Sequence, residues 1–245
     1  MKMKNKRAVQ EDERRRHKEL LKFEKRNKRK NSGKLERENE STLEIKPNIL
    51  IVCEGEVTEP SYFEQFRLTS ATVEVLGKGY NTISLVEEAR RFRDVSKNEF
   101  SEVWCVFDKD DFSETDFDNA IVLAESFGFK VACSNQAFEY WLVLHFNDHQ
   151  GGAINRRNYV KMINSGIKPF NLQYAKNGKK IVTDEIFEIL LAKDSKYHHR
   201  RRIDLAIQRA KRIMTEFKNN NIPYSSRCSS TSVHKLVIEL LKYTD

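Results

Sequence analysis

The chain has 245 residues, of which 39% are apolar and 33% are charged, so it can bury at least one sizeable core. No run approaches the roughly 18 apolar residues of a membrane helix, and no apolar stretch follows the Lys/Arg-rich N-terminus. We therefore expect a cytoplasmic protein without a membrane segment. The four cysteines form no Cys-x-x-Cys pair, which argues against a zinc knuckle and a disulfide scaffold.

The net charge of +8 lies in residues 1–46, which hold 17 Lys and Arg against 9 Asp and Glu. Residues 47–245 hold 27 of each kind and are neutral overall. Too few apolar residues lie in the first segment to form a core, so it is expected to be a basic, flexible tail. Its Arg and Lys clusters predict salt-sensitive binding to nucleic-acid phosphates, and a purely solubilising tail is the equally weighted alternative.

After Pro47, the pattern predicts strands that alternate with helices. The first strand is a continuous apolar run, typical of a strand buried on both faces, and Pro60 suits the first turn of the next helix, with Glu59 as its cap. The expected strands are 49–53, 72–76, 102–107 and 129–133, and the expected helices are 60–66, 83–92 and 117–127. This alternation predicts an α/β fold: a mostly parallel sheet with helices on both faces.

Beyond residue 135 the strand pattern fades. Apolar residues at a helical period predict helices over 138–146, 203–217 and 233–243. Three pairs that contain glycine, at 151–152, 165–166 and 177–178, are expected to interrupt this part as turns. We therefore predict an α/β domain over residues 47–150 and a mainly helical region over residues 151–245 that packs on it.

Acidic residues follow the first and third predicted strands, as Glu54-Gly55-Glu56 and as Asp108-Lys109-Asp110-Asp111. Functional sites of open α/β sheets lie beyond the carboxyl ends of the strands, so these carboxylates meet if the two strands are neighbours. In an extended chain Asp108 and Asp110 project to the same side and could grip one hard cation. Mg²⁺ takes only one or two protein carboxylates, which suits phosphodiester chemistry, and Gly55 would let the backbone approach a phosphate.

Acids at strand ends also occur in calcium loops, in phospho-acceptor pockets and at helix starts. An EF-hand loop that starts at Asp108 would need an oxygen ligand at Phe112 and a glycine at Ser113, so it is excluded. A phospho-acceptor pocket would be expected to have paired aspartates after the first strand, whereas this chain has Glu54-Gly55-Glu56 there. The alternative that stays open is that the acids only cap the following helices, because Asp is ordinary at a strand-to-helix turn.

The ordered motifs resemble a known family. A Glu-Gly after the first strand and an Asp-x-Asp after a later strand look like the Toprim domain of topoisomerases, primases and a class of nucleases. More narrowly, the chain resembles the RloB family over about residues 47–245. The blocks that carry this likeness are 51–56, 58–63, 107–110, 134–146 and 230–236.

The resemblance implies a Toprim-like fold, phosphodiester chemistry that depends on Mg²⁺ or Mn²⁺, and association with bacterial restriction or antiphage loci, where a partner ATPase is expected. Glu54 would be a metal ligand or general acid/base, while Asp108 and Asp110 would hold metal. One departure is Gln136-Ala137 where a Pro-Cys pair is expected, which would alter the loop without removing Glu139.

Glu139 stands among large apolar residues, so its charge needs a partner or a metal. We expect it to be a second-metal ligand or to position a basic residue, unless a helix start at Asn135 leaves it exposed. His145 and His149 are four residues apart, but Phe146 takes the place of the glutamate in His-Glu-x-x-His, which argues against a zinc protease.

A basic patch near the end of the chain is expected to hold the nucleic-acid backbone opposite the acids. The alternative is a solvated helix face whose charges pair with acids elsewhere. The expected binding residues are Lys196, Arg200, Arg201, Arg202, Arg209, Arg212 and Lys235.

These features favour a metal-dependent nuclease that acts on DNA or RNA. The alternative is a nucleic-acid-binding sensor that keeps the fold and the metal site but works through a partner enzyme without cutting. Topoisomerase chemistry needs a nucleophile from a further domain, and we expect this chain to be too short to contain one. Hydrolysis is therefore preferred to strand rejoining.

Overall fold

The structure is a computed structural model that describes residues 47–68, 71–75, 82–110, 112–150 and 152–244. The predicted basic tail, residues 1–46, lies outside the described residues. Residues 46–245 make up one compact unit, to which the following description applies.

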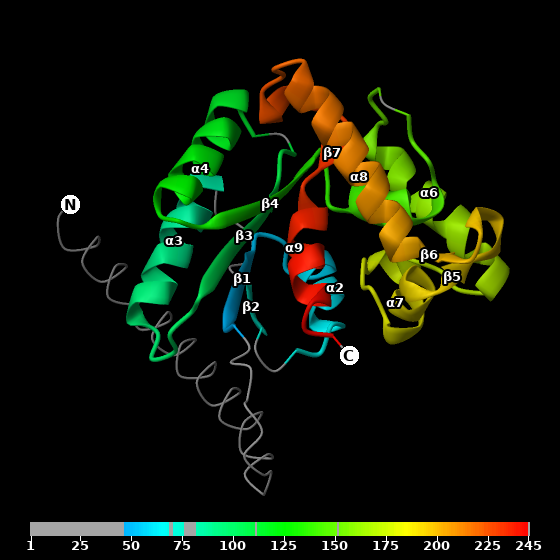
Figure 1. Ribbon diagram of the computed structural model, residues 1–245, viewed down its shortest axis with the longest axis horizontal. Helices are drawn as coiled ribbons and strands as arrows, with labels where there is room; N and C mark the ends of the chain where they lie inside the picture. The colour runs from blue at the N-terminus through cyan, green and yellow to red at the C-terminus, as the bar shows by residue number, and fades with distance from the viewer. Residues whose placement is uncertain (1–46, 69–70, 76–81, 111, 151, 245) are drawn as a thin grey trace, which may run out of the picture. The chain divides into compact units, whose positions relative to one another are not determined.

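The core of this unit is a five-stranded sheet with the order β2-β1-β3-β4-β7 (Figure 1). The first four strands run parallel, and β7 joins the edge of β4 in the antiparallel direction. All five side chains of β1 are buried, as the apolar run predicts for a strand with covered faces. The strands are β1 (Ile49–Cys53), β2 (Ala71–Val75), β3 (Glu102–Asp108), β4 (Lys130–Asn135) and β7 (Ser230–Thr231).

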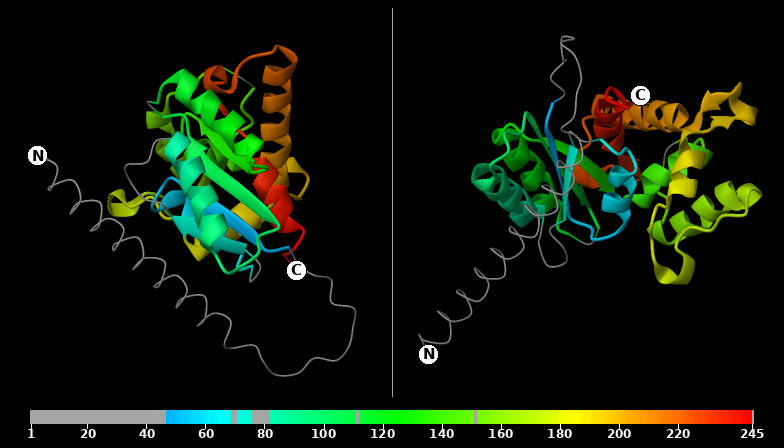
Figure 2. Two further views of the ribbon diagram at one scale, coloured as in Figure 1. Left: turned by 90° about the vertical axis from the view of Figure 1, so that its left-hand side faces the viewer. Right: turned by 90° about the horizontal axis from the view of Figure 1, so that it is seen from below.

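Helices cover both faces of this sheet (Figures 1 and 2). On one face lie α3 (Thr82–Val95) and α4 (Glu114–Ser126), where the Phe107 ring of β3 meets the Phe117 ring of α4. On the other face α2 (Thr58–Glu64), α5 (Glu139–Phe146) and α9 (Val233–Leu241) share one apolar core with β1 and β3. The predicted α/β class, with a mostly parallel sheet and helices on both faces, is confirmed.

The chain after residue 152 is mainly helical, as predicted. Besides α9, its helices are α6 (Tyr159–Ile167), α7 (Asp184–Leu191) and α8 (Arg202–Asn219), and the short strands β5 (Lys193–Asp194) and β6 (Arg200–Arg201) pair as a second, two-stranded sheet. Single 3₁₀ turns, η1 (Arg156–Asn158), η2 (Lys168–Phe170), η3 (Lys176–Gly178), η4 (Ser195–Tyr197) and η5 (Tyr224–Ser226), separate these elements.

Two details of this part differ from the prediction. The pair Ser165–Gly166, expected as a turn, lies inside α6. A Cβ at Gly166 would collide with the ring of Phe146. The glycine therefore allows close packing of α6 on α5 instead of breaking a helix. The chain also returns to the sheet at the two-residue strand β7, where the hydroxyls of Ser134 and Thr231 are 3.0 Å apart.

Membrane segments and disulfides were both expected to be missing. Within the described part of the chain, every helix is too short or too polar to cross a lipid bilayer. Cys105, Cys133 and Cys228 carry free thiols, and Cys53, Cys105 and Cys133 are buried in the sheet.

Candidate active site

The acids that follow β1 and β3 meet at the carboxyl end of the sheet. The register places Cys53 beside Val106, so the chain leaves both strands at the same level. The backbone N–H of Glu54 donates to the Val106 carbonyl at 3.0 Å, and the Asp108 N–H donates to a Glu54 carboxylate oxygen at 3.3 Å. Both side chains are half-buried. Parallel pairing of β1 with β3 therefore gathers the carboxylates of Glu54 and Asp108.

Asp108 also fixes the start of α5. Its Oδ2 accepts a hydrogen bond from the backbone N–H of Phe138 at 2.9 Å, just before the helix begins at Glu139. A carboxylate is favourable at this end because the first N–H groups of a helix have no partner within it. This bond brings the carboxyl group of Glu139 to the same edge of the sheet.

Glu139 is buried, with 5% of its surface exposed, and it has a cationic partner. The Lys180 ammonium lies 2.6 Å from the Glu139 carboxylate, and the Tyr174 hydroxyl is 3.5 Å from the same oxygen. The Thr58 hydroxyl donates to the Lys180 carbonyl at 3.0 Å, which ties this lysine to α2. The position of Glu139 thus matches the expectation that a charge among apolar side chains needs a partner.

Glu59 is a member of this site that the sequence interpretation missed. It was expected to cap α2, yet the N-cap of α2 is Val57, and no side chain caps this helix end. The carboxylate of Glu59 is buried against Gly55: a Cβ there would lie 2.6 Å from Cδ and 2.7 Å from Oε1. The space that Gly55 leaves is occupied by this carboxylate. The only sequence signal was its place in the block 58–63.

Burial raises the pKa values of Glu54, Glu59 and Asp108, and repulsion from neighbouring carboxylates adds to this effect for Glu59 and Asp108. Burial raises the pKa of Glu54. For Glu59, burial and then the charges of Glu139 and Glu54 raise the pKa to about 7, against the opposing charge of Lys180. Burial, followed by the charges of Glu59, Glu139 and Glu54, raises the pKa of Asp108 well above its ordinary value. The site therefore favours uptake of a proton or another cation.

Asp110 has partners outside this group. The strand β3 ends at Asp108, and Asp110 has a left-handed backbone with φ of 40°. Its N–H donates to the Gln136 carbonyl at 3.2 Å, and its carboxylate forms an ion pair with Arg156. The premise of an extended chain over 108–110 is wrong, because the backbone turns directly after the strand. The two-residue alternation that placed Asp110 beside Asp108 does not apply there.

The four site acids are Glu54, Glu59, Asp108 and Glu139. Across the part of the chain that the structure describes, no three Asp, Glu, His or Cys side chains are arranged as a metal-ligand set. The adjacent pair Glu54 and Asp108 still fits a hard cation, because both donors are carboxylate oxygens and Mg²⁺ commonly takes only one or two from the protein. The raised pKa values also indicate that a cation beside these carboxylates would be stabilised.

Two of the seven predicted nucleic-acid-binding residues are buried. The Arg202 guanidinium lies 3.0 Å from the Asp194 carboxylate and donates to the Ile189 carbonyl at 3.2 Å. Arg209 donates to the Leu144 carbonyl at 2.7 Å and so joins α8 to α5. Only 8% and 3% of their surfaces are exposed, so Arg202 and Arg209 hold the fold together and do not present charge to a ligand.

The other predicted binding residues are on the surface or near it, and three of them have polar partners. Arg200 donates to Gln208 at 2.9 Å, Arg201 forms a two-bonded ion pair with Asp204, and Arg212 lies 2.9 Å from Asp148. Lys196 and Lys235 are exposed. A role of these five residues in nucleic-acid binding stays a prediction.

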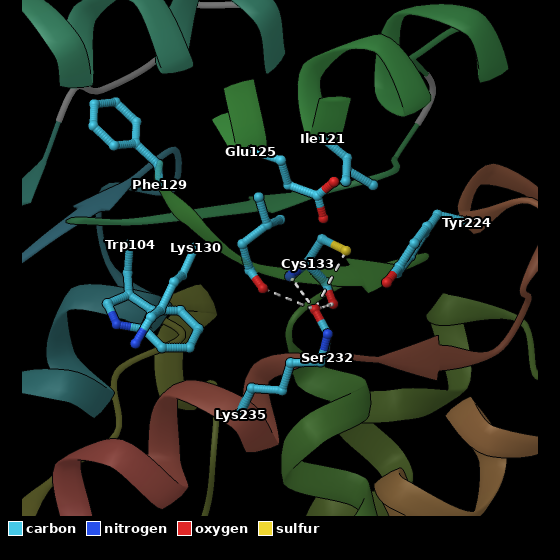
Figure 3. A pocket seen from close by; sticks show the side chains of 10 residues that line it. Trp104, Ile121, Glu125, Phe129, Lys130, Cys133, Tyr224, Ser232 and Lys235 are labelled. Atoms are coloured by element: carbon cyan, nitrogen blue, oxygen red, sulfur yellow. Dashed lines mark hydrogen bonds between the residues drawn. The ribbon is translucent and has the colours of Figure 1, made fainter. Parts of the chain in front are cut away.

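A separate cavity of about 210 Å³ opens beside β4 (Figure 3). Its lining includes Trp104, Lys130, Cys133 and Lys235. None of the four site acids is among the residues that line this cavity, so it is distinct from the carboxylate site. Burial raises the pKa of the Cys133 thiol to about 11, which makes it a poor nucleophile at neutral pH.

The histidines four residues apart have separate structural partners. The Nδ1 of His145 lies 3.0 Å from the Trp141 carbonyl, and burial lowers the pKa of this imidazole to about 3, so it is neutral. The Nδ1 of His149 lies 2.6 Å from the Tyr140 hydroxyl, beyond the end of α5 at Phe146. These contacts agree with the argument against a zinc protease.

Comparison with known proteins gave one match. The model of a family described as RloB-like protein matches residues 49–240, which span β1 to the last turn of α9 and include every carboxylate of the site. No curated protein and no solved structure matches the chain.

Proposed function

The chain belongs to the RloB-like protein family, and from this premise we propose that it is a metal-dependent nuclease that hydrolyses phosphodiester bonds of DNA or RNA. The observation that carries the proposal is the gathering of Glu54, Glu59, Asp108 and Glu139 at the carboxyl end of the sheet, with raised pKa values for the first three. Such perturbed groups at a strand-end site are typical of catalytic centres.

In this proposal Glu54 and Asp108 hold Mg²⁺ or Mn²⁺. A bound divalent ion would supply an activated water and charge stabilisation for the leaving oxygen. The hydrogen bonds to Glu54 from β3 and to Asp108 from α5 fix the two carboxylates from separate elements. This cross-linking orients the pair before a substrate binds, which lowers the reorganisation needed for catalysis.

The remaining site residues have roles that do not require contact with the metal. Glu59, with a pKa of about 7, can accept a proton near neutral pH at a buried position. Glu139 holds the ammonium of Lys180 beside the carboxylates, and 45% of the Lys180 side chain stays exposed. An exposed cation at that place can contact a phosphate oxygen of the substrate. Asp110, paired with Arg156, is the member of the predicted metal set with the weakest geometric support.

A role in bacterial restriction or antiphage defence, with a partner ATPase, is part of the same proposal and rests on the family alone. The second candidate is a sensor that binds nucleic acid without cutting it. The ion pair between Asp110 and Arg156 favours that candidate, because it leaves fewer carboxylates for metal.

Cleavage assays separate these candidates. The full chain is incubated with single- and double-stranded DNA, with RNA and with tRNA, in Mg²⁺, Mn²⁺ or EDTA. We expect cleavage of at least one nucleic acid that requires the metal, and a loss of about 100-fold or more in Glu54→Gln and in Asp108→Asn. Glu87→Gln, at an exposed position of α3, is the matched control and should cleave like the parent.

Cleavage that persists in both site variants would contradict the nuclease proposal. A parent protein that binds nucleic acid but never cuts it, in the presence of either metal, would favour the sensor.

A further inference from the structure

A second basic region is recognised by its lack of acidic residues. Residues 149–183 contain no Asp or Glu, although the chain is charge-rich, and the remaining residues of 47–245 hold 20 basic against 27 acidic side chains. Residues 47–245 are therefore neutral only because the positive charge of residues 149–183 offsets the negative charge of the others. We name residues 156–180 the basic segment; its seven cations are Arg156, Arg157, Lys161, Lys168, Lys176, Lys179 and Lys180.

The fold anchors the basic segment by its apolar residues and leaves its charges outside. Tyr159, Ile163 and Ile167 are buried at a spacing of four residues along α6, and Tyr174 is buried in the following loop. This period puts one face of α6 on the core and the other toward solvent. Six of the seven cations are exposed, and Arg156 is half-buried.

Both ends of the basic segment reach carboxylates that follow neighbouring strands. Arg156 pairs with Asp110, which follows β3, and Lys180 pairs with Glu139, at the start of the helix after β4. One end of the segment therefore lies beside Asp110, two residues after the site residue Asp108, and the other end lies at the site residue Glu139. In Figures 1 and 2, α6 and the chain leading to α7 lie on the opposite side of the sheet from α3 and α4.

The cations between these ends have no acid to neutralise them. Among the residues that the structure describes, Arg157, Lys161, Lys168, Lys176 and Lys179 form no ion pair. By contrast, Arg201, Arg202, Arg209 and Arg212 of the predicted basic patch all lie next to an acid. Unpaired like charges on one surface create a positive potential that attracts a polyanion.

We propose that the basic segment is the surface that holds the phosphate backbone of the nucleic acid and leads it to the carboxylate site. The inference rests on the proposed function for its ligand, and it places the ligand at residues 156–180 instead of the predicted patch around Lys196–Arg212. Phosphates that bind lysines release condensed counterions, so this surface gives affinity that is independent of sequence and falls steeply with salt. DNA and RNA share this chemistry.

Three matched charge-reversal pairs in the full chain test the location. Lys168→Glu/Lys176→Glu changes the basic segment, Lys196→Glu/Arg200→Glu changes the predicted patch, and Lys97→Glu/Lys218→Glu is the control. All six residues are exposed, and each pair changes the net charge equally. Binding of labelled single- and double-stranded DNA and RNA is followed by fluorescence anisotropy in EDTA, from about 50 to about 200 mM salt.

We expect the Lys168/Lys176 pair to weaken binding by about tenfold or more at about 50 mM salt and to reduce the slope of log K against log salt by about 1.5. The other two pairs should stay within about threefold of the parent. The nucleic acid whose binding differs most between the Lys168/Lys176 pair and the parent is the one that the basic segment prefers. Circular dichroism and thermal unfolding show whether each variant is folded.

The inference is overturned if the Lys168/Lys176 pair binds like the control pair, if the Lys196/Arg200 pair has the larger effect, or if the parent binds no nucleic acid. Because binding is measured without metal, its failure is separate from a failure of cleavage. A protein that binds through the basic segment but does not cut supports this inference and contradicts the nuclease proposal.

Discussion

Two of the regions that enclose charged side chains in this molecule differ in how those charges are paired. Between α8 and its neighbours, Arg202 meets Asp194 and backbone carbonyls, and Arg209 meets the Leu144 carbonyl. At the carboxyl end of the sheet, Glu59 and Asp108 instead lie among other carboxylates, and burial followed by the charges of these neighbours raises their pKa values. The first region gives both guanidinium groups an acidic or carbonyl partner and so joins α8 to its neighbours. The second keeps like charges together, which is a cost that folding alone does not explain.

The largest effect on stability is expected from removing a buried, paired charge between α8 and its neighbours. Arg202→Met removes a buried guanidinium and leaves Asp194 without its partner, so we expect the free energy of unfolding to fall by about 3 kcal/mol. Denaturant unfolding measures this loss. Lys168→Met, on the exposed surface, should change stability by less than about 0.5 kcal/mol. Equal losses in the two variants would contradict a structural role for Arg202.

The opposite sign is expected in the carboxylate group. The folded protein holds a proton on Glu59 up to a pKa of about 7, against an ordinary value of 4.5, so stability from this group is lost as the pH rises between these values. Glu59→Gln removes the titration. We expect the variant to be more stable than the parent at pH 8, by on the order of 2 kcal/mol, and to lose less stability between pH 5 and 8.

Unfolding across this pH range, without divalent ions, measures the difference. Glu87→Gln should follow the parent at every pH, because Glu87 is exposed on α3. A parent and a Glu59→Gln variant with the same pH dependence would show that Glu59 does not carry the raised pKa.

The smallest effect is expected at the pair that joins the basic segment to the site. Arg156 and Asp110 are both 40% exposed, so Arg156→Gln should change stability by less than about 1 kcal/mol. It should weaken nucleic-acid binding in EDTA by about threefold, because one phosphate-binding cation is lost. Asp110→Asn, which frees Arg156, should bind as tightly as the parent or more tightly. Weaker binding by Asp110→Asn would contradict this role of Arg156.

Much of the fold could be predicted because the spacing of apolar residues indicates which face of each element is buried. The strand Ile49–Cys53 has the expected bounds, because a short apolar run rich in β-branched residues is typical of a strand that is buried on both faces. Helix α4 starts at Glu114, earlier than expected, because the Ser113 hydroxyl accepts from the Asp116 N–H at 3.0 Å. The strand β7 was missed because two polar residues carry no apolar alternation.

The site was predictable only where one strand end determined a residue's place. Glu54 and Asp108 meet because they lie at the carboxyl ends of neighbouring parallel strands, whereas the position of Asp110 depends on the turn that comes after β3. The burial of Glu59 depends on how α2 docks against Gly55, and the pairing of Glu139 with Lys180 depends on the course of the basic segment. Such contacts arise from tertiary packing, which no local pattern contains.

The central claim is that the carboxylates after β1 and β3 hold a divalent cation, and Mn²⁺ binding tests it most directly. Electron paramagnetic resonance at about pH 7.5 counts the free Mn²⁺ left in solution by the parent, by Asp108→Asn and by Glu87→Gln. We predict that the parent and Glu87→Gln bind Mn²⁺ that Mg²⁺ displaces, and that Asp108→Asn weakens this binding by about tenfold or more. Equal binding by the parent and Asp108→Asn, or no binding by the parent, would contradict the claim.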